Sequence, residues 1–240
     1  MQRIIRLLAV LTIAYCWSVT SVNAQTTLIN PLTDGGFEAG ATFAANNWIV
    51  VNTPPLQTNQ WFCGTGAVGF TGARCAFVGT ASNNNNYSNV TSVVHLYRDV
   101  VVPPGQNDIR LYFSWKCRGR SNEDYLSIYA IDPSITPTAG VPVSSGLLAG
   151  NLRNQTTWLN DSLDVPCTFS GSTVRIVFSW INDAANATTP AIAIDNIALI
   201  CNGSSNCIAA MGLGLVNVPS LPYNSGPGTT CGMDDDVTDG

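Results

Sequence analysis

Hydrophobic and polar residues alternate with a period of two along much of the chain, which is the pattern of half-buried β-strands. Residues 108–119 place their apolar side chains on one face: Ile109, Leu111, Phe113, Trp115 and Cys117. Residues 172–183 repeat this design, and the segments 124–132, 93–102 and 74–80 predict further strands. No segment shows the stripe of an amphipathic helix.

Turn-forming segments separate these strands at the spacing of a β-sandwich. They cover residues 102–108, 118–124, 182–190 and a long Pro-containing loop at 132–146. The pattern predicts an all-β fold, a jelly-roll β-sandwich, as the single main domain over residues 25–201. Its core aromatics are expected to be Phe37, Phe113, Trp115, Phe178 and Trp180.

The first 24 residues have the features of a secretory signal peptide. Arg3 and Arg6 precede a short apolar stretch, and a small residue, Ala24, offers a cleavage point. No later apolar run is long enough to span a bilayer, so no membrane span is expected after signal removal. The expected location is secreted or at the cell surface.

Charge and composition limit the partners. Lys and Arg total 10 and Asp and Glu total 15, so without Arg3 and Arg6 eight basic residues face 15 acidic ones, a net charge of −7. The sequence therefore lacks the excess of basic residues that nucleic-acid binding requires. Residues 202–240 are rich in Gly, Pro, Ser and Asn, and we interpret them as a linker and the truncated start of a further β-domain of the same polypeptide.

Seven cysteines remain after Cys16 leaves with the signal peptide, and an oxidising compartment favours their pairing. Spacing and strand faces predict three disulfide bonds, which leave Cys231 for an absent domain. The predicted bonds are Cys63–Cys75, Cys117–Cys167 and Cys201–Cys207.

A carboxylate stands in the middle of the last apolar strand, at Asp195. The first and last strands of jelly rolls are commonly neighbours, which would bring Glu38 close to Asp195. Two carboxylates with backbone carbonyls and an Asn would suit Ca²⁺, with Asp34 as a further candidate ligand. The alternative is that Asp195 accepts hydrogen bonds from loop amides while Glu38 is solvated.

The order of four motifs resembles the galactose-binding-like jelly-roll modules of secreted bacterial proteins. The motifs are "TDGGFEAG", "YRDVVVPPGQNDIRLYFSW", "DYLSIYAID" and "PAIAIDNIAL", and the resemblance covers about residues 30–200. The most similar group is the choice-of-anchor J, cleaved-adhesin and MAM-like set. In related carbohydrate-binding jelly rolls an early Glu and a late Asp hold a structural calcium, which implies Glu38 and Asp195.

The sequence contains few residues that could form a catalytic site. His95 is the only histidine, and no serine stands in a nucleophile-elbow sequence. Glu123 and Asp124 are adjacent on a strand, so they point to opposite faces and do not form a glycosidase pair. We expect no hydrolase activity.

Aromatic residues in loop-like or strand-edge contexts are candidates to stack on sugar rings, although each could equally be packed in the core. They include Trp48 and Phe62, and the predicted ligand-binding residues are Trp61, Tyr87 and Trp158. The sequence therefore predicts a non-catalytic adhesion or carbohydrate-binding module of a surface-associated bacterial protein, bound to a glycan or a cell-surface protein. The alternative is an accessory domain of a secreted protease or glycoside hydrolase.

Overall fold

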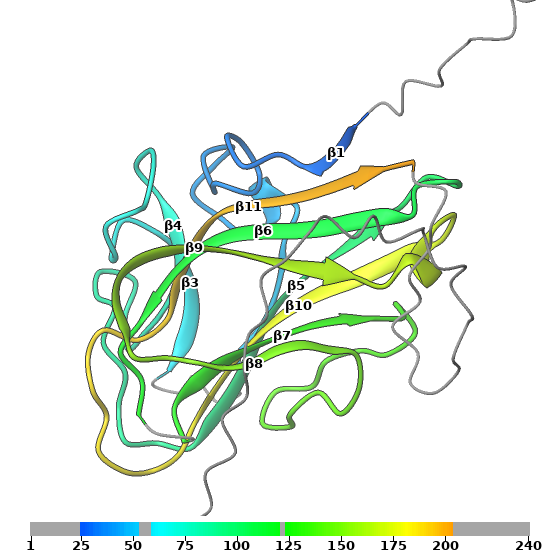
Figure 1. The fold of residues 1–240 in the computed structure, drawn as a ribbon. Coiled ribbons are helices and arrows are strands. Elements are labelled where there is room, and N and C mark those ends of the chain that lie inside the picture. The colour runs from blue at the N-terminus through cyan, green and yellow to red at the C-terminus, as the bar shows by residue number, and fades with distance from the viewer. Residues whose placement is uncertain (1–24, 53–58, 121–122, 204–240) are drawn as a thin grey trace, which may run out of the picture. The chain divides into compact units, whose positions relative to one another are not determined.

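The structure, a computed structural model, describes residues 25–52, 59–120 and 123–203. The predicted signal peptide and residues 204–240 of the expected linker, which include Cys207 and Cys231, lie outside the described residues, whereas Asn202 is the last residue of a strand. Two antiparallel sheets lie face to face in the described part (Figure 1). The all-β jelly-roll sandwich predicted from the alternation is confirmed.

The first sheet has six strands in the order β3-β4-β11-β6-β9, with β1 also paired to β11. Its strands are β1 (Thr26–Ile29), β3 (Gln60–Gly64), β4 (Cys75–Gly79), β6 (Asp108–Cys117), β9 (Gln155–Val165) and β11 (Ala193–Asn202). The first and last strands are therefore neighbours, as expected for a jelly roll. Glu38, however, lies outside β1, directly after the turn formed by residues 31–37, rather than in a strand.

The second sheet has five strands in the order β2-β5-β10-β7-β8. They are β2 (Ile49–Val51), β5 (Ser92–Val101), β7 (Tyr125–Ile131), β8 (Leu147–Leu152) and β10 (Thr173–Asn182). Two short 3-10 helices, η1 (Ala44–Asn46) and η2 (Cys167–Phe169), complete the described elements.

The main core fills the space between the two sheets, and all five predicted core aromatics are buried in it. Phe178 of β10 lies at its centre, with ring centroids 5.9 Å from Trp48 and 6.0 Å from Phe113. A second, smaller group, here called the outer cluster, consists of Ala67, Cys75, Phe77 and Ala193. It lies on the outer face of the six-stranded sheet, where the segment between β3 and β4, which contains Ala67, covers the strands.

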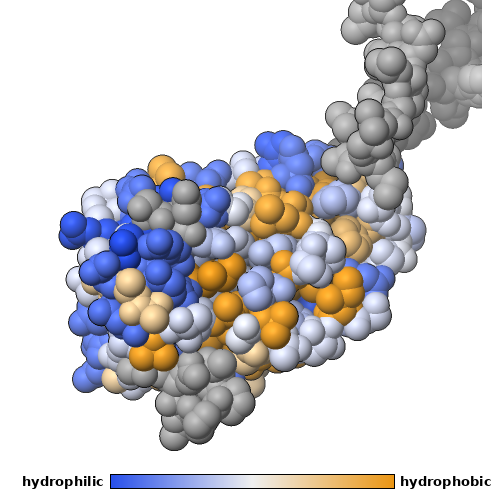
Figure 2. Space-filling view, turned by 90° about the horizontal axis from the view of Figure 1, so that it is seen from below, coloured by the Kyte–Doolittle hydropathy of each residue, from blue (hydrophilic) through white to orange (hydrophobic). Residues whose placement is uncertain are grey.

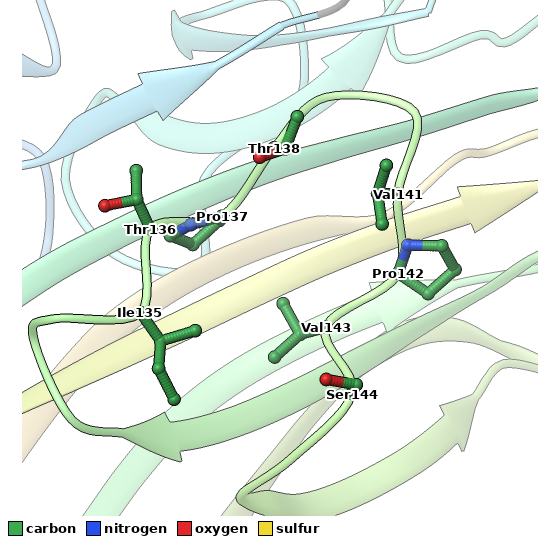
Figure 3. A pocket seen from close by; sticks show the side chains of 8 residues that line it. All are labelled: Ile135, Thr136, Pro137, Thr138, Val141, Pro142, Val143 and Ser144. Atoms are coloured by element: carbon green, nitrogen blue, oxygen red, sulfur yellow. The ribbon is translucent and has the colours of Figure 1, made fainter.

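The long loop 132–146 covers the outer face of the five-stranded sheet. Its backbone accepts a hydrogen bond from Arg175 through the Ile135 carbonyl, and the Gly140 N–H donates to Val93. Figure 3 shows this loop lying over the strands, and eight of its residues line a small pocket of about 150 Å³. One face of the sandwich is thus closed by the chain itself.

Apolar side chains also reach the surface. The face seen from below, on the side of β8 in Figure 1, carries apolar patches separated by polar residues (Figure 2). Leu147 of β8 is 60% exposed. No helix in the described part of the chain is long and apolar enough to cross a membrane.

Cys63 and Cys75 are both free thiols, so the predicted bond between them is wrong. In the register of β3 and β4, Cys63 lies opposite Ala76, and Cys75 lies opposite Gly64. This offset of one residue points the two thiols to opposite faces of the sheet. Cys63 packs against the main core, whereas Cys75 belongs to the outer cluster.

The predicted Cys117–Cys167 bond is also wrong, because Cys117 is a free thiol. Cys117 ends β6, whereas Cys167 follows the end of β9, where Val165 lies opposite Ile109. Antiparallel pairing therefore places the two cysteines at opposite ends of β6, roughly 25 Å apart. Cys167 is in η2 and not in a strand, so strand alternation did not apply to it.

Cys201 is a buried free thiol as well, so the predicted Cys201–Cys207 bond is wrong. Burial raises the pKa of Cys63 to about 11 and that of Cys75 to about 12. These thiols stay protonated at neutral pH and act as small apolar side chains.

Phe178→Ala should lower the free energy of unfolding by about 3–5 kcal/mol, because it leaves a cavity between the two sheets. Urea unfolding followed by tryptophan fluorescence measures this loss. Leu147→Ala, at an exposed position, is the matched control and should change stability by less than about 0.5 kcal/mol. Equal losses in the two variants would contradict this placement of the core.

Candidate ligand-binding face

Asp195 is fully buried, although it lies on the outer face of its sheet. Ile194 belongs to the main core and Ala193 to the outer cluster, so alternation along β11 places Asp195 on the side of Ala193. The strand pairing is irregular directly after Asp195, and Asn196 has a left-handed backbone with φ of 49°. The chain that covers Asp195 is the loop between β3 and β4, residues 65–74.

The Asp195 carboxylate accepts three backbone hydrogen bonds. Its Oδ2 accepts from the N–H of Phe70 at 2.7 Å and from that of Thr71 at 3.2 Å. Its Oδ1 accepts from the N–H of Asn196 at 2.8 Å. Asp195 thus accepts hydrogen bonds from loop amides, which is one half of the alternative to calcium binding.

Glu38 binds the other end of the same loop and is not merely solvated. Its Oε1 accepts from the N–H groups of Ala73 at 2.8 Å and Arg74 at 2.6 Å, and Oε2 lies 3.5 Å from the Arg74 guanidinium. Gly72, directly before Ala73, has φ of 67°, and a Cβ atom there would approach Glu38 Oε1 to 2.6 Å. Glu38 and Asp195 together form a carboxylate clamp that holds residues 70–74.

The buried position of Asp195 raises the pKa of its carboxyl group. Burial raises the pKa of Asp195 to about 6, while the N–H donors of Asn196, Thr71 and Phe70 oppose part of this rise. The negative charge of Glu38 raises it further. Asp195 is thus a carboxylate that titrates close to neutral pH.

Glu38 and Asp195 are bonded to hydrogen-bond donors, namely backbone N–H groups and the Arg74 guanidinium. A calcium site would instead surround the ion with six to eight oxygen atoms. Among the described residues no group of three or more His, Cys, Asp or Glu side chains could hold a metal ion. Asp34 instead pairs with Arg98 at 2.6 Å. Calcium binding by Glu38, Asp195 and Asp34 stays a prediction.

The clamped loop carries Phe70 to the outer face of the six-stranded sheet. Phe70 is 39% exposed, and its ring centroid lies 5.9 Å from that of Trp158 on β9. The Lys116 ammonium lies 4.6 Å from the Trp158 ring centroid and donates to the Val68 carbonyl at 3.1 Å. Cation–π and aromatic contacts thus fix the position of Trp158.

A shallow pocket of about 340 Å³ opens beside these aromatics. Tyr112 of β6, 40% exposed, shares its lining with Phe70 and with the amides Asn160 and Asn196. The Asn160 carbonyl oxygen accepts from Ser114 and that of Asn196 accepts from Thr71. Both side-chain N–H groups have no partner among the described residues, so they are available to a ligand. We call Tyr112, Phe70, Trp158, Asn160 and Asn196 the aromatic face.

Two of the three predicted ligand-binding aromatics are buried. Trp61 is 2% exposed and donates to the Val94 carbonyl at 3.2 Å. Tyr87 is 5% exposed and donates to Asp124 at 2.7 Å. Neither ring can stack on a sugar, and only Trp158 lies on the aromatic face. Tyr112 is not among the predicted ligand-binding residues, although its position between Leu111 and Phe113 in the alternating pattern was a signal that its ring lies on the outer face of the sheet.

A serine does lie beside His95, which the sequence did not predict. His95 Nδ1 is 2.5 Å from Ser179 Oγ across β5 and β10, and His95 Nε2 is 3.0 Å from the Thr138 carbonyl of loop 132–146. Both residues are fully buried. A peptide or glycoside therefore has no access to Ser179 in this structure. The contact of His95 with Thr138 joins loop 132–146 to the sheet.

No family model and no curated protein matches the chain. The resemblance to the choice-of-anchor J, cleaved-adhesin and MAM-like set therefore stays a prediction.

Several solved structures have a similar fold. A family 61 carbohydrate-binding module in complex with β-1,4-galactotriose is 14% identical, with 71% of this chain and 97% of that chain covered and a TM-score of 0.45. The CBM22-1 xylan-binding domain from Paenibacillus barcinonensis is 12% identical (78% and 100% covered, TM-score 0.43). The K3 cleaved adhesin domain of Lys-gingipain from Porphyromonas gingivalis is 15% identical (73% and 99%, TM-score 0.41). At these values the likeness carries no argument about what this chain binds.

Asp195→Asn should remove a pH dependence of stability. Between about pH 4 and pH 6 the folded wild type holds a proton on Asp195 that the unfolded chain has released. Its free energy of unfolding therefore falls as pH rises through this range, and the asparagine variant lacks this fall. Urea unfolding at pH 4, 5, 6 and 7 measures the slopes. Asp164→Asn, at an exposed ion pair with Arg110, is the control and should keep the wild-type slope; parallel slopes for Asp195→Asn and wild type would contradict the expectation.

Calcium binding is tested by the melting temperature with excess calcium and with EDTA. An ion that binds only the folded state stabilises it by about 2.7 kcal/mol at a hundredfold excess over Kd. If Glu38 and Asp195 hold calcium, EDTA lowers the melting temperature by several degrees, and Asp195→Ala abolishes this effect while Asp99→Ala retains it. An unchanged melting curve would show that the clamp needs only its N–H donors.

Proposed function

We propose that the chain is a non-catalytic carbohydrate-binding or adhesion module of a secreted, surface-associated bacterial protein, and that its glycan binds to the aromatic face. The observation that carries this proposal is the combination, on one open sheet face, of partly exposed rings with unpaired amide donors. Tyr112 and Phe70 are each about 40% exposed beside Asn160 and Asn196.

This combination suits the chemistry of a sugar. A pyranose ring presents C–H groups that pack on an aromatic ring, and its hydroxyls accept hydrogen bonds from amide N–H groups. Few charged groups line the pocket, with Asp161 as the one carboxylate in its lining. We therefore favour a neutral polysaccharide over a charged one.

The two faces of the sandwich differ in what they can offer a partner. Loop 132–146 covers the outer face of β5, β10 and β7 through contacts with His95 and Arg175. In the described part of the chain no such loop lies over Tyr112 and Asn160 on β6 and β9, and both residues are exposed. This difference supports the six-stranded sheet as the side that a glycan would bind.

The proposal treats the chain as a binder rather than a catalyst, because its serine–histidine pair is buried under loop 132–146. The adjacent Glu123 and Asp124 also have separate partners. Glu123 pairs with Arg120 at the surface, whereas Asp124 is buried and accepts from Tyr87. The alternative role, an accessory domain of a secreted protease or glycoside hydrolase, would use the same aromatic face to bring an enzyme to its substrate.

Trp158→Ala and Tyr112→Ala should each weaken glycan binding about tenfold, since each removes a stacking contact on the order of 1.4 kcal/mol. Affinity electrophoresis in gels with soluble β-1,4-galactan or xylan identifies a ligand, and titration calorimetry then measures Kd. Tyr125→Ala, on the opposite sheet, is the matched control and should bind as wild type. Binding that survives both substitutions, or that fails only in Tyr125→Ala, would contradict this site.

A further inference from the structure

A second concave region lies on the outer face of the five-stranded sheet, beside the tip of loop 132–146. It is a pocket of about 440 Å³, and its floor is formed by Val93 of β5, Ile181 of β10 and Tyr125 of β7. Ile181 lies opposite both of the other residues in the strand register, so the three side chains form a row across adjacent strands. Ile181 is two positions after Ser179 and therefore points to the same outer face. We call this region the end pocket.

The end pocket has two different walls. One wall is the tip of the loop, with Gly140 and Pro142, and the Gly140 N–H donates to the Val93 carbonyl at 2.9 Å. Figure 3 shows Pro142 where the loop turns back from its tip. The other wall lies at the strand ends and contains Glu123 and Asp183. The pocket is thus bounded by a loop that is bonded to its floor and by a wall with two carboxylates.

The wall at the strand ends carries more negative than positive charge. Glu123 pairs with Arg120 at 3.1 Å, whereas Asp183 has no ion-pair partner among the described residues and accepts from the Ala185 N–H at 2.8 Å. The buried Asp124 accepts from the Asp183 N–H at 3.2 Å. Burial raises the pKa of Asp124, and the negative charge of Asp183 adds to this rise. The charge of Asp183 is therefore not cancelled by its surroundings.

The lining of the end pocket suits a lysine side chain. It contains no Lys, Arg or His, and its apolar floor can pack against the four-carbon stem. The Tyr125 ring attracts an ammonium group through its π-system, and the carboxylates and the Thr91 hydroxyl can accept hydrogen bonds from the three ammonium N–H donors. A hydrated metal ion would not match an apolar floor, because calcium takes six to eight oxygen ligands.

The rim of the end pocket favours a polypeptide over a free amine. Val141 and Val90 are each adjacent in sequence to a lining residue, and both are exposed. Apolar side chains on either side of a lysine could pack against them. The whole chain has 15 acidic and 10 basic residues, and this excess of negative charge steers cationic partners toward it.

We propose that the end pocket binds a lysine side chain of a partner polypeptide. The ammonium group lies between Glu123 and Asp183, and the stem lies along the floor against Tyr125. The pocket and the aromatic face are on opposite sheets, so the two sites are separate. The proposal does not depend on the glycan that the aromatic face binds.

Titration of the isotope-labelled full chain with a blocked five-residue peptide, in which one lysine lies between two leucines, tests the site directly. The peptide should shift the NMR resonances of the Gly140 and Asp183 amides and leave that of Tyr112, on the other sheet, unchanged. The same peptide with an Nε-acetylated lysine keeps the stem but lacks the charge, and it should bind on the order of tenfold more weakly. Raising the salt concentration from about 0.1 M to about 1 M shortens the Debye length from about 10 Å to about 3 Å and should also weaken binding.

A double variant tests the charged wall. Glu123→Gln with Asp183→Asn should weaken binding of the lysine peptide about tenfold, because it removes both carboxylate partners and leaves Arg120 unpaired beside the pocket. Asp108→Asn with Asp164→Asn removes the same charge from the six-stranded sheet and is the matched control, which should bind as wild type. Unchanged melting temperatures would show that the variants are folded.

Tyr125→Ala gives a further readout. It should weaken binding of the lysine peptide several-fold, roughly the loss expected for one cation–π contact, and leave glycan binding unchanged. Equal binding of the lysine and acetyllysine peptides, or equal losses in the two double variants, would overturn the proposal, because either result shows that the pocket does not recognise the charge. A chain that binds the lysine peptide as expected but binds no glycan would contradict only the glycan proposal.

Discussion

The carboxylate clamp formed by Glu38 and Asp195 is the interaction on which the outer face of the six-stranded sheet depends. Two carboxylates distant in sequence bind the backbone N–H groups at both ends of residues 70–74. A buried carboxylate without partners is strongly destabilising, and here each one is bonded to donors that the loop would otherwise leave unpaired. The loop and the carboxylates therefore stabilise each other.

The clamp also links stability to the proposed binding surface. Asp195 accepts from the N–H of Phe70, the residue whose ring lies beside Trp158. A loop fixed through its backbone leaves its side chains available for contact, which is how rigid binding loops are built on β-scaffolds. The position of Phe70 is thus set by a carboxylate on the neighbouring strand β11 rather than by the packing of its own ring alone.

The outer faces of the two sheets are covered differently in the described part of the chain. On the five-stranded sheet, loop 132–146 lies over His95 and Arg175 and satisfies their polar atoms. On the six-stranded sheet, the shorter loop 65–74 covers only the region around Asp195 and the outer cluster. Among the described residues no loop covers the region around Tyr112, whose side chain is 40% exposed.

The sequence by itself determined the fold class, the strands with clear alternation, and the core aromatics, because burial on one face of a strand imposes a period of two on the side chains. It also pointed to Glu38 and Asp195, but as calcium ligands on neighbouring first and last strands, whereas Glu38 lies outside β1 and both carboxylates bind backbone N–H groups of the loop 65–74. Only the tertiary structure decided the rest. The disulfide pairing depended on strand register, which a shift of one residue inverts, so Cys63 and Cys75 point to opposite faces. The exposure of each aromatic depended on the side to which the fold turns it, because Trp61 and Tyr87 belong to the main core, whereas Tyr112 lies on the outer face of β6 and is 40% exposed.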